Sequence, residues 1–227
     1  MLKKIAVALG VLVLGFVLVV ALQPSHLHVE RSKTMLAPPE VVFAFVNDLK
    51  RWQNWSPWDK LDPEMQRDYA DTTVGVGAKY SWNGNDKVGQ GSMTITKSEP
   101  SEQVMLDLHF IKPWEGHNTA TFRFEPAPHG TKLTWSMDGE QNFMAKAAGL
   151  FLDMDTLVGG DFEKGLDSLK ALAEPEAQRM KAEAKAKAAA AEQADLEALI
   201  QAEAEAEAAP DEGEGEEPAA GDSKNPG

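Results

Sequence analysis

The sequence predicts an α+β fold: a curved antiparallel sheet wrapped around a long C-terminal helix, with an N-terminal transmembrane helix and a low-complexity acidic tail. Three observations support this. An unbroken apolar run stands near the N-terminus, period-two alternation occupies about 64–138, and an amphipathic helical pattern follows at 156–173. A chain of 227 residues has room for one ordinary domain with flanking segments. We therefore expect an anchor at 1–23, a domain at 24–173 and a tail at 174–227.

The apolar run covers residues 5–22 and is long enough to cross a bilayer. At about 1.5 Å per residue it forms a helix of roughly 27 Å, close to the ~30 Å hydrocarbon core. Lys3 and Lys4 precede it and no cation follows before Arg31. The positive-inside rule therefore predicts a single-pass membrane protein with a cytoplasmic N-terminus and an extracytoplasmic domain, periplasmic in a cell with an outer membrane. The alternative is a signal peptide cleaved after Ala21, although the run exceeds the usual ~7 to 15 apolar residues.

The domain is expected to begin with a strand at 28–37. Pro38 and Pro39 suit the approach to a helix and its first turn, so a short helix is predicted at 41–49. The next stretch, 52–58, reads Trp-Gln-Asn-Trp-Ser-Pro-Trp. Three tryptophans around a Ser-Pro step predict a tight, aromatic-packed connection rather than a regular element.

From about residue 64 to 138, apolar and polar residues alternate in short runs separated by turn residues. The pattern predicts an antiparallel meander with one apolar face, and the clearest turn is Ala-Pro-His-Gly at 127–130. The residues expected on the inner face are Tyr80, Trp82, Met93, Ile95, Val104, Leu106, Leu108, Phe110, Phe122, Phe124, Leu133, Trp135 and Met137.

A long amphipathic helix at 156–173 is expected to cover this face. Its apolar positions recur at helical spacing: Val158, Phe162, Leu166, Leu169 and Leu172. Between sheet and helix, residues 142–154 are hydrophobic with few strong capping signals, and we interpret them as a flexible lid.

The element order resembles the helix-grip fold of the SRPBCC superfamily, which includes START-like domains and polyketide cyclases. Short sequence motifs within about 26–173 resemble those of its bacterial membrane-anchored branch. The similar motifs are Val-Glu-Arg-Ser at 29–32, Ala-Pro-Pro-Glu-Val-Val-Phe at 37–43, the tryptophan stretch at 52–58, Gly75-x-Gly77, Gly89-x-Gly91 and Phe-Glu-Lys-Gly-Leu at 162–166. Fold alone assigns neither ligand nor reaction.

The resemblance implies a cavity between sheet and helix that takes lipids or other apolar small molecules. We therefore expect a membrane-tethered carrier, sensor or ligand chaperone. The alternatives are a polyketide cyclase/dehydratase-like enzyme and a protein-interaction module with a filled core. The predicted ligand-binding residues are Tyr80, Trp82, Met93, Leu106, Leu108, Phe110, Phe122, Phe124, Trp135, Met137, Phe162 and Leu166.

The inner face offers little for acid/base catalysis, because Tyr80 is its one titratable residue. We therefore predict no catalytic residue, and we expect no cofactor and no metal ion. Asp107 and His109 fall on the opposite strand face. His26 and His28 could present two imidazoles on one side of a strand, but interfacial polar residues are expected just outside an anchor. Gly75-x-Gly77 and Gly89-x-Gly91 lack the lysine and the helix start of phosphate loops.

Most of the net charge of −14 belongs to the tail, where residues 174–227 include 15 acidic and five basic side chains. The domain shows no basic patch, so nucleic-acid binding is not expected. The absence of cysteine excludes disulfides and thiolate metal sites. The tail is expected to be a solvated, partly helical spacer that ends in a disordered segment at 210–227, and a docking segment for a basic protein partner is the alternative.

Overall fold

A computed structural model describes residues 1–113 and 115–207. Contacts divide the chain into two units, Met1–Met180 and Lys181–Gly227. The elements, in chain order, are α1 (Leu2–Ala21), β1 (His26–Met35), α2 (Pro39–Val46), the 3-10 turns η1 (Leu49–Asn54) and η2 (Trp58–Lys60), β2 (Gln66–Tyr69), β3 (Lys79–Asn83), β4 (Gln90–Glu99), β5 (Gln103–Lys112), β6 (Gly116–Ala127), β7 (Gly130–Glu140), α3 (Phe143–Gly149) and α4 (Met154–Glu207).

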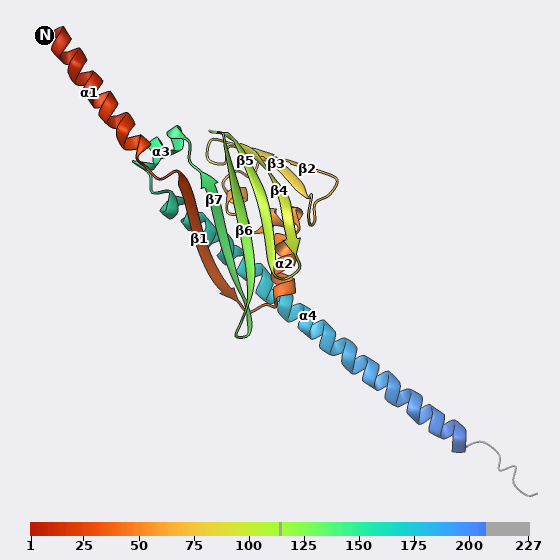
Figure 1. Cartoon of the computed structure of the whole chain (residues 1–227). Helices are drawn as coiled ribbons and strands as arrows, with labels where there is room; N and C mark the ends of the chain where they lie inside the picture. Colours follow the sequence, from red (N-terminus) through yellow and green to blue (C-terminus); the bar gives the residue numbers. More distant parts are fainter. Residues whose placement is uncertain (114, 208–227) are drawn as a thin grey trace, which may run out of the picture. The chain divides into compact units, whose positions relative to one another are not determined.

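The first unit is built on one seven-stranded antiparallel sheet with the order β1-β7-β6-β5-β4-β3-β2 (Figure 1). The strands from β2 to β7 follow one another as a meander, and β1 joins at the β7 edge. Because β1 runs antiparallel to β7, its first residue, His26, pairs with Glu140 at the end of the meander. The predicted α+β helix-grip fold is confirmed.

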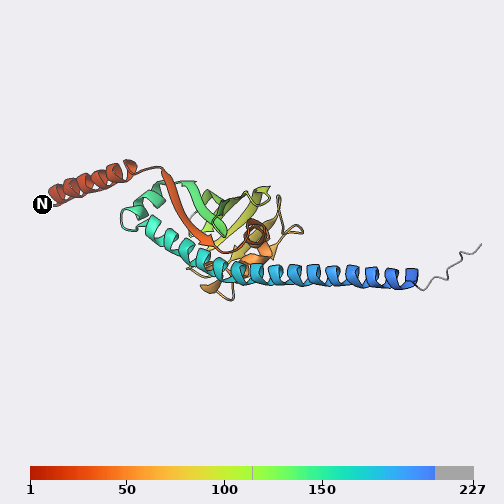
Figure 2. The ribbon, with the colours of Figure 1, turned by 90° about the horizontal axis from the view of Figure 1, so that it is seen from below.

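The N-terminal part of α4 lies along the inner face of the curved sheet (Figure 2). The ring of Phe162 stacks on Trp135 of β7 with centroids 4.0 Å apart and planes 8° apart. Gly165 permits this packing, because a Cβ atom there would lie 2.8 Å from Cζ3 of Trp135. Arg31 of β1 fixes the start of α4 by hydrogen bonds to Asp155 and Glu163. The helix thereby covers the apolar sheet face as the amphipathic pattern predicts.

The tryptophan stretch is more regular than expected. The predicted aromatic packing is confirmed, but the stretch is partly regular, because residues 52–54 belong to η1 and Trp58 begins η2, with 55–57 between them. Asp48 caps η1 by accepting a hydrogen bond from the backbone N–H of Lys50 (3.0 Å). The indole N–H groups of Trp52 and Trp55 donate to the carbonyls of Val46 (2.8 Å) and Phe45 (3.3 Å). These bonds tie the aromatic rings to the end of α2 and direct them under the sheet.

The segment interpreted as a lid contains the short helix α3. Its capping signal is Asn142, whose side chain accepts a hydrogen bond from the backbone N–H of Ala145 (2.9 Å). Asn is a preferred N-cap residue, so this signal was present in the sequence. Large apolar side chains here are exposed: Phe143, Met144, Phe151 and Leu152.

Helix α1 is long and apolar enough to cross a membrane, a property that a signal sequence shares. Nearly all of its large apolar side chains are exposed, and Val20 near its end is buried. Its C-terminal end contacts α3. Only residues 22–25 separate it from β1.

Helix α4 runs beyond the predicted end at residue 173 and continues to Glu207 with Pro175 inside it. In the second unit, the side chains of residues 181–204 are exposed. The segment 210–227, expected to be disordered, lies outside the described residues.

Candidate functional site: an apolar cavity

A cavity of about 690 Å³ lies between the sheet and the covering helices. Its walls come from β3 to β7, from the tryptophan stretch, and from α3 and α4. Most of the lining is apolar, and it includes five glycine or alanine residues: Gly89, Gly116, Ala120, Ala145 and Ala148. Their short side chains occupy little of the enclosed space.

Eight of the twelve predicted ligand-binding residues line this cavity: Tyr80, Trp82, Met93, Leu108, Phe110, Trp135, Met137 and Phe162. The other four, Leu106, Phe122, Phe124 and Leu166, point into the same interior but lie in its packed part. Lining residues that the sequence reasoning missed include Leu27, Trp52, Trp58, Met65, Val88 and Ala120.

The interior has a filled half and a hollow half, and the change occurs within single strands. Along β5, Leu106 is fully buried, whereas Leu108 retains 8% exposure because it faces the cavity. In the filled half, Trp55 packs edge-on against Phe122 with ring centroids 6.1 Å apart. Trp52 and Trp135 contact Phe122 and also line the cavity, so they form the wall between the halves.

The hollow half opens at the end of the sheet where β1 begins. The rim includes polar residues from the β3–β4 turn and from the end of β7, such as Lys87 and Glu140, and Glu140 pairs with His26. The same end holds α3, as Figure 1 shows. Several large apolar side chains are exposed here, and Phe151 retains 80% of its accessible surface. The cavity mouth is therefore bordered by both polar and hydrophobic side chains.

Four carboxylate residues line the cavity, Asp59, Asp86, Glu115 and Glu140, and Asp59 is the one that is not exposed. The side chain of Asp59, 9% exposed, accepts two hydrogen bonds from Arg67 at Oδ1, from Nε (2.8 Å) and Nη2 (2.6 Å). Burial and the neighbouring Asp59 raise the pKa of the Tyr80 phenol. Asp59 follows no strand alternation, so the periodic pattern gave no signal for it.

The glycine pair Gly89-x-Gly91 serves close packing. A Cβ atom on Gly91 would lie 2.5 Å from Cζ2 of Trp82 and 2.6 Å from the carbonyl oxygen of His109. The absence of a side chain lets the Trp82 indole approach the backbone of the neighbouring strand closely. Gly91 therefore helps to set the position of Trp82 on the cavity wall.

Four of the five histidines lie on the outer sheet face, and His129 lies in the turn between β6 and β7. His26 Nε2 and His28 Nδ1 both donate to Oδ1 of Asp138, at 3.2 and 2.7 Å. The hydrogen bond to Asp138 raises the pKa of His28. Burial opposes ionisation of Asp138, but the hydrogen bonds from His28 and His26 outweigh it and lower its pKa. Asp107 and His109 also lie on this face, in agreement with the strand register inferred from the sequence.

Residues 26–174 match the family model described as "Polyketide cyclase / dehydrase and lipid transport". The match covers more than half of the 227-residue chain. The chain belongs to this family. It is thus a member of the SRPBCC superfamily, and this family together with an apolar cavity indicates binding of a hydrophobic ligand.

Several solved structures are similar to this chain at low sequence identity. A protein from Chromobacterium violaceum is 18% identical, covers 67% of this chain and 99% of its own, and has a TM-score of 0.49. The Aha1 dimer from Colwellia psychrerythraea is 17% identical, with coverages of 65% and 96% and a TM-score of 0.48. The di-domain ARO/CYC StfQ of the steffimycin biosynthetic pathway is 9% identical, with coverages of 67% and 52% and a TM-score of 0.51. A comparison with curated proteins gives no match.

Proposed function

We propose that this family member is a membrane-tethered, extracytoplasmic domain that binds a lipid-like or other apolar small molecule in its cavity. The observation that supports this is a cavity of about 690 Å³ whose walls are mainly apolar and aromatic and include α3, the helix that α1 contacts. Ligand pockets in proteins are commonly about 300–1,000 Å³ and mainly apolar. The volume therefore suits one small ligand.

The energetics favour a ligand with a long apolar part. Each methylene removed from water contributes about 0.8 kcal/mol, so about ten of them contribute roughly 8 kcal/mol. The loss of translational and rotational freedom costs at least about 4 kcal/mol. A chain of that length therefore offsets a cost in the lower part of the ~4–15 kcal/mol range even without a specific polar contact.

The position of the mouth links binding to the membrane. From Ala21 to His26 there are five chain steps, which span at most about 18 Å. With α1 in the bilayer, the end of the sheet that holds the mouth stays close to the lipid surface. The exposed side chains of Phe143, Met144 and Phe151 are suited to contact that surface.

Native mass spectrometry tests the binding part of the proposal. The full chain is extracted in mild detergent, and its mass is measured before and after incubation with a fatty acid and a phospholipid. We expect one molecule bound per chain, either co-purified or taken up. A chain that stays empty in every preparation would refute ligand binding.

Topology is tested separately. A reporter that is active only outside the cytoplasm is fused to the C-terminus, and membranes are washed with carbonate. We expect an active reporter that stays in the membrane fraction. Activity of a cytoplasmic reporter would overturn the orientation, and a soluble product that begins near Leu22 would support a signal peptide.

An enzymatic function is the second candidate, and Asp59 is the observation that favours it. A carboxylate on a cavity wall beside Arg67 and Tyr80 is the type of group that transfers protons in general acid/base catalysis. Under this alternative, incubation converts a polyketide-like ligand to a product lighter by one water, and Asp59→Asn binds the ligand without forming that product. Recovery of unchanged ligand from the unaltered protein supports binding alone.

A further inference from the structure

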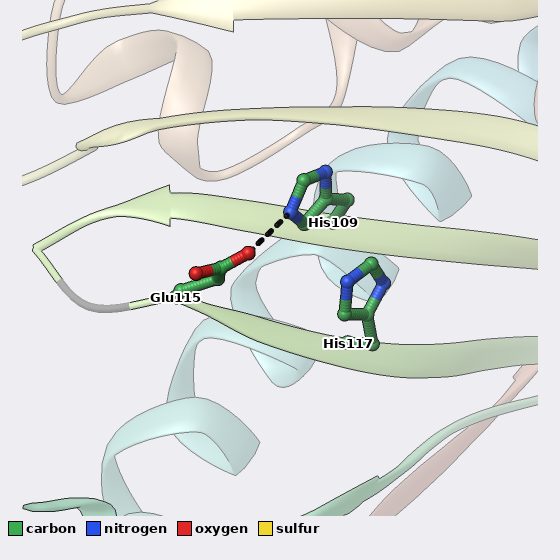
Figure 3. Close-up of side chains that lie close together, drawn as sticks. All are labelled: His109, Glu115 and His117. Atoms are coloured by element: carbon green, nitrogen blue, oxygen red, sulfur yellow. Dashed lines mark ion pairs between the residues drawn. The ribbon is translucent and has the colours of Figure 1, made fainter.

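Two histidines and a glutamate converge on the outer face of the β5–β6 hairpin (Figure 3). His109 and His117 are direct cross-strand partners, and their rings stack with centroids 4.2 Å apart and planes 7° apart. Glu115, just before β6, places Oε1 3.6 Å from Nε2 of His109. The potential ligand atoms of these residues all lie within 4.8 Å of one another. Among residues 1–113 and 115–207, no other group of histidines and carboxylates meets this criterion.

The strand register explains the convergence. Leu108 faces inward, so its neighbour His109 faces outward, and a directly opposite residue on the adjacent strand points the same way. Nε2 of His109 is buried and forms no hydrogen bond. An unsatisfied buried polar atom is unfavourable, and a bound cation would satisfy it.

We propose that His109, Glu115 and His117 bind a divalent transition-metal ion such as Zn²⁺. Imidazole and carboxylate are ligands that Zn²⁺ and its late first-row neighbours accept, and this chain has no cysteine to offer a competing thiolate. Three protein ligands leave a fourth tetrahedral position for water or an external ligand. The site lies on the outer face, so it goes beyond the proposed function of the cavity.

The rearrangement that binding requires is small. Bond lengths of about 2.0–2.1 Å place the ligand atoms of a tetrahedral zinc site about 3.4 Å apart. The two rings must turn out of their stack so that one nitrogen of each faces the ion. Glu115 is largely exposed and can follow. Because Glu115 also lines the cavity mouth, the ion would join the outer face of the hairpin to the rim.

The second histidine group on this face provides an internal comparison. His26 and His28 already share one oxygen of Asp138. The proposal assigns the ion to the β5–β6 group and not to this one. Variants in the two groups therefore distinguish the sites.

The test uses the full chain without a histidine tag, in detergent, stripped of metal by a chelator. Zn²⁺ is titrated in competition with a chromophoric chelator. We expect one ion per chain, and we expect His109→Gln and His117→Gln each to weaken binding at least about tenfold, since loss of an outer-shell partner alone weakens metal sites by about 10–100-fold. Glu115→Gln is expected to weaken binding less than either. Matched controls are His28→Gln and His129→Asn, the latter at a positive φ of 69° that Asn tolerates.

Binding of Co²⁺ gives a second readout that needs no variant. Intense visible absorption bands, typical of tetrahedral cobalt, are expected in the unaltered protein. Absence of these bands together with no Zn²⁺ binding would overturn the proposal. Equal Zn²⁺ affinity in His109→Gln, His117→Gln and the unaltered chain would also overturn it. The same holds if His28→Gln, rather than these two variants, lowers the Zn²⁺ affinity.

Discussion

Beneath α4, the end of the sheet near α2 is filled by Trp55 and Phe122, whereas the end near α3 encloses a cavity of about 690 Å³ beside Ala120 and Met137. The same strands β5, β6 and β7 cross both halves. Backbone geometry therefore does not separate them, and side-chain volume does. A fold of this kind can keep its stability in one half while the other half changes to suit a ligand.

Truncation of a large aromatic residue in each half should give the largest difference in the free energy of unfolding. Trp55→Ala in the filled half is expected to lower the free energy of unfolding by about 3–5 kcal/mol, because a fully buried side chain leaves a void. Phe110→Ala in the hollow half should lower the free energy of unfolding less, since Phe110 is only partly buried and already faces the cavity. Denaturant titration of both variants measures this. Equal losses would show that the two halves pack alike.

Insertion of a large residue sharpens the same comparison. Leu106→Trp overpacks the filled half and should cost about 1–3 kcal/mol of stability. Ala120→Trp places the same ring in the cavity and should leave the melting temperature nearly unchanged. Native mass spectrometry should then find Ala120→Trp at least about tenfold poorer in bound ligand. A destabilised Ala120→Trp that still binds normally would contradict the hollow half as the ligand site.

A smaller effect is expected where α4 meets the wall between the halves. In Gly165→Ala, the new Cβ atom approaches Cζ3 of Trp135 to 2.8 Å, and the resulting strain outweighs the higher helix propensity of alanine. We expect a net loss of about 1 kcal/mol. Gly160→Ala is the matched control, because open space surrounds that position and the propensity gain of about 0.5–1 kcal/mol should appear unopposed. The melting temperatures of the two variants test this prediction. An increase in both would contradict the close packing at Gly165.

The smallest effect lies outside both halves, at His28 and Asp138. The hydrogen bond to Asp138 raises the pKa of His28, so its stabilisation is complete below the ordinary histidine pKa of about 6.5 and disappears as pH rises through the raised value. The pKa of Asp138 is lowered, so its contribution is lost in acid. His28→Gln should therefore reduce stability at pH 5–6 and have little effect at pH 9. Unfolding curves at both pH values check this, and a pH-independent loss would contradict it.

The sheet and its inner face could be predicted because alternation in β3 to β7 records which side of a strand is buried. Alternation does not show whether an inward-facing residue lies in the filled half or the hollow half. Leu106 and Leu108 therefore look equivalent in the sequence, although only Leu108 faces the cavity. The filled half is filled partly by Trp55, which packs on Phe122 and comes from the 52–58 stretch, outside the sheet. The pairing of His109 with His117 follows from folding the hairpin about Pro113, but the approach of Glu115 depends on the turn geometry and could not be predicted.

The short connection between α1 and β1 restricts what the domain can do. Under the proposed topology, a connection that reaches at most about 18 Å prevents the cavity from travelling to a second membrane. Such a protein does not ferry its ligand between bilayers. It samples one leaflet by lateral diffusion, so its occupancy reports the local abundance of the ligand, and any onward delivery requires an acceptor that comes to it.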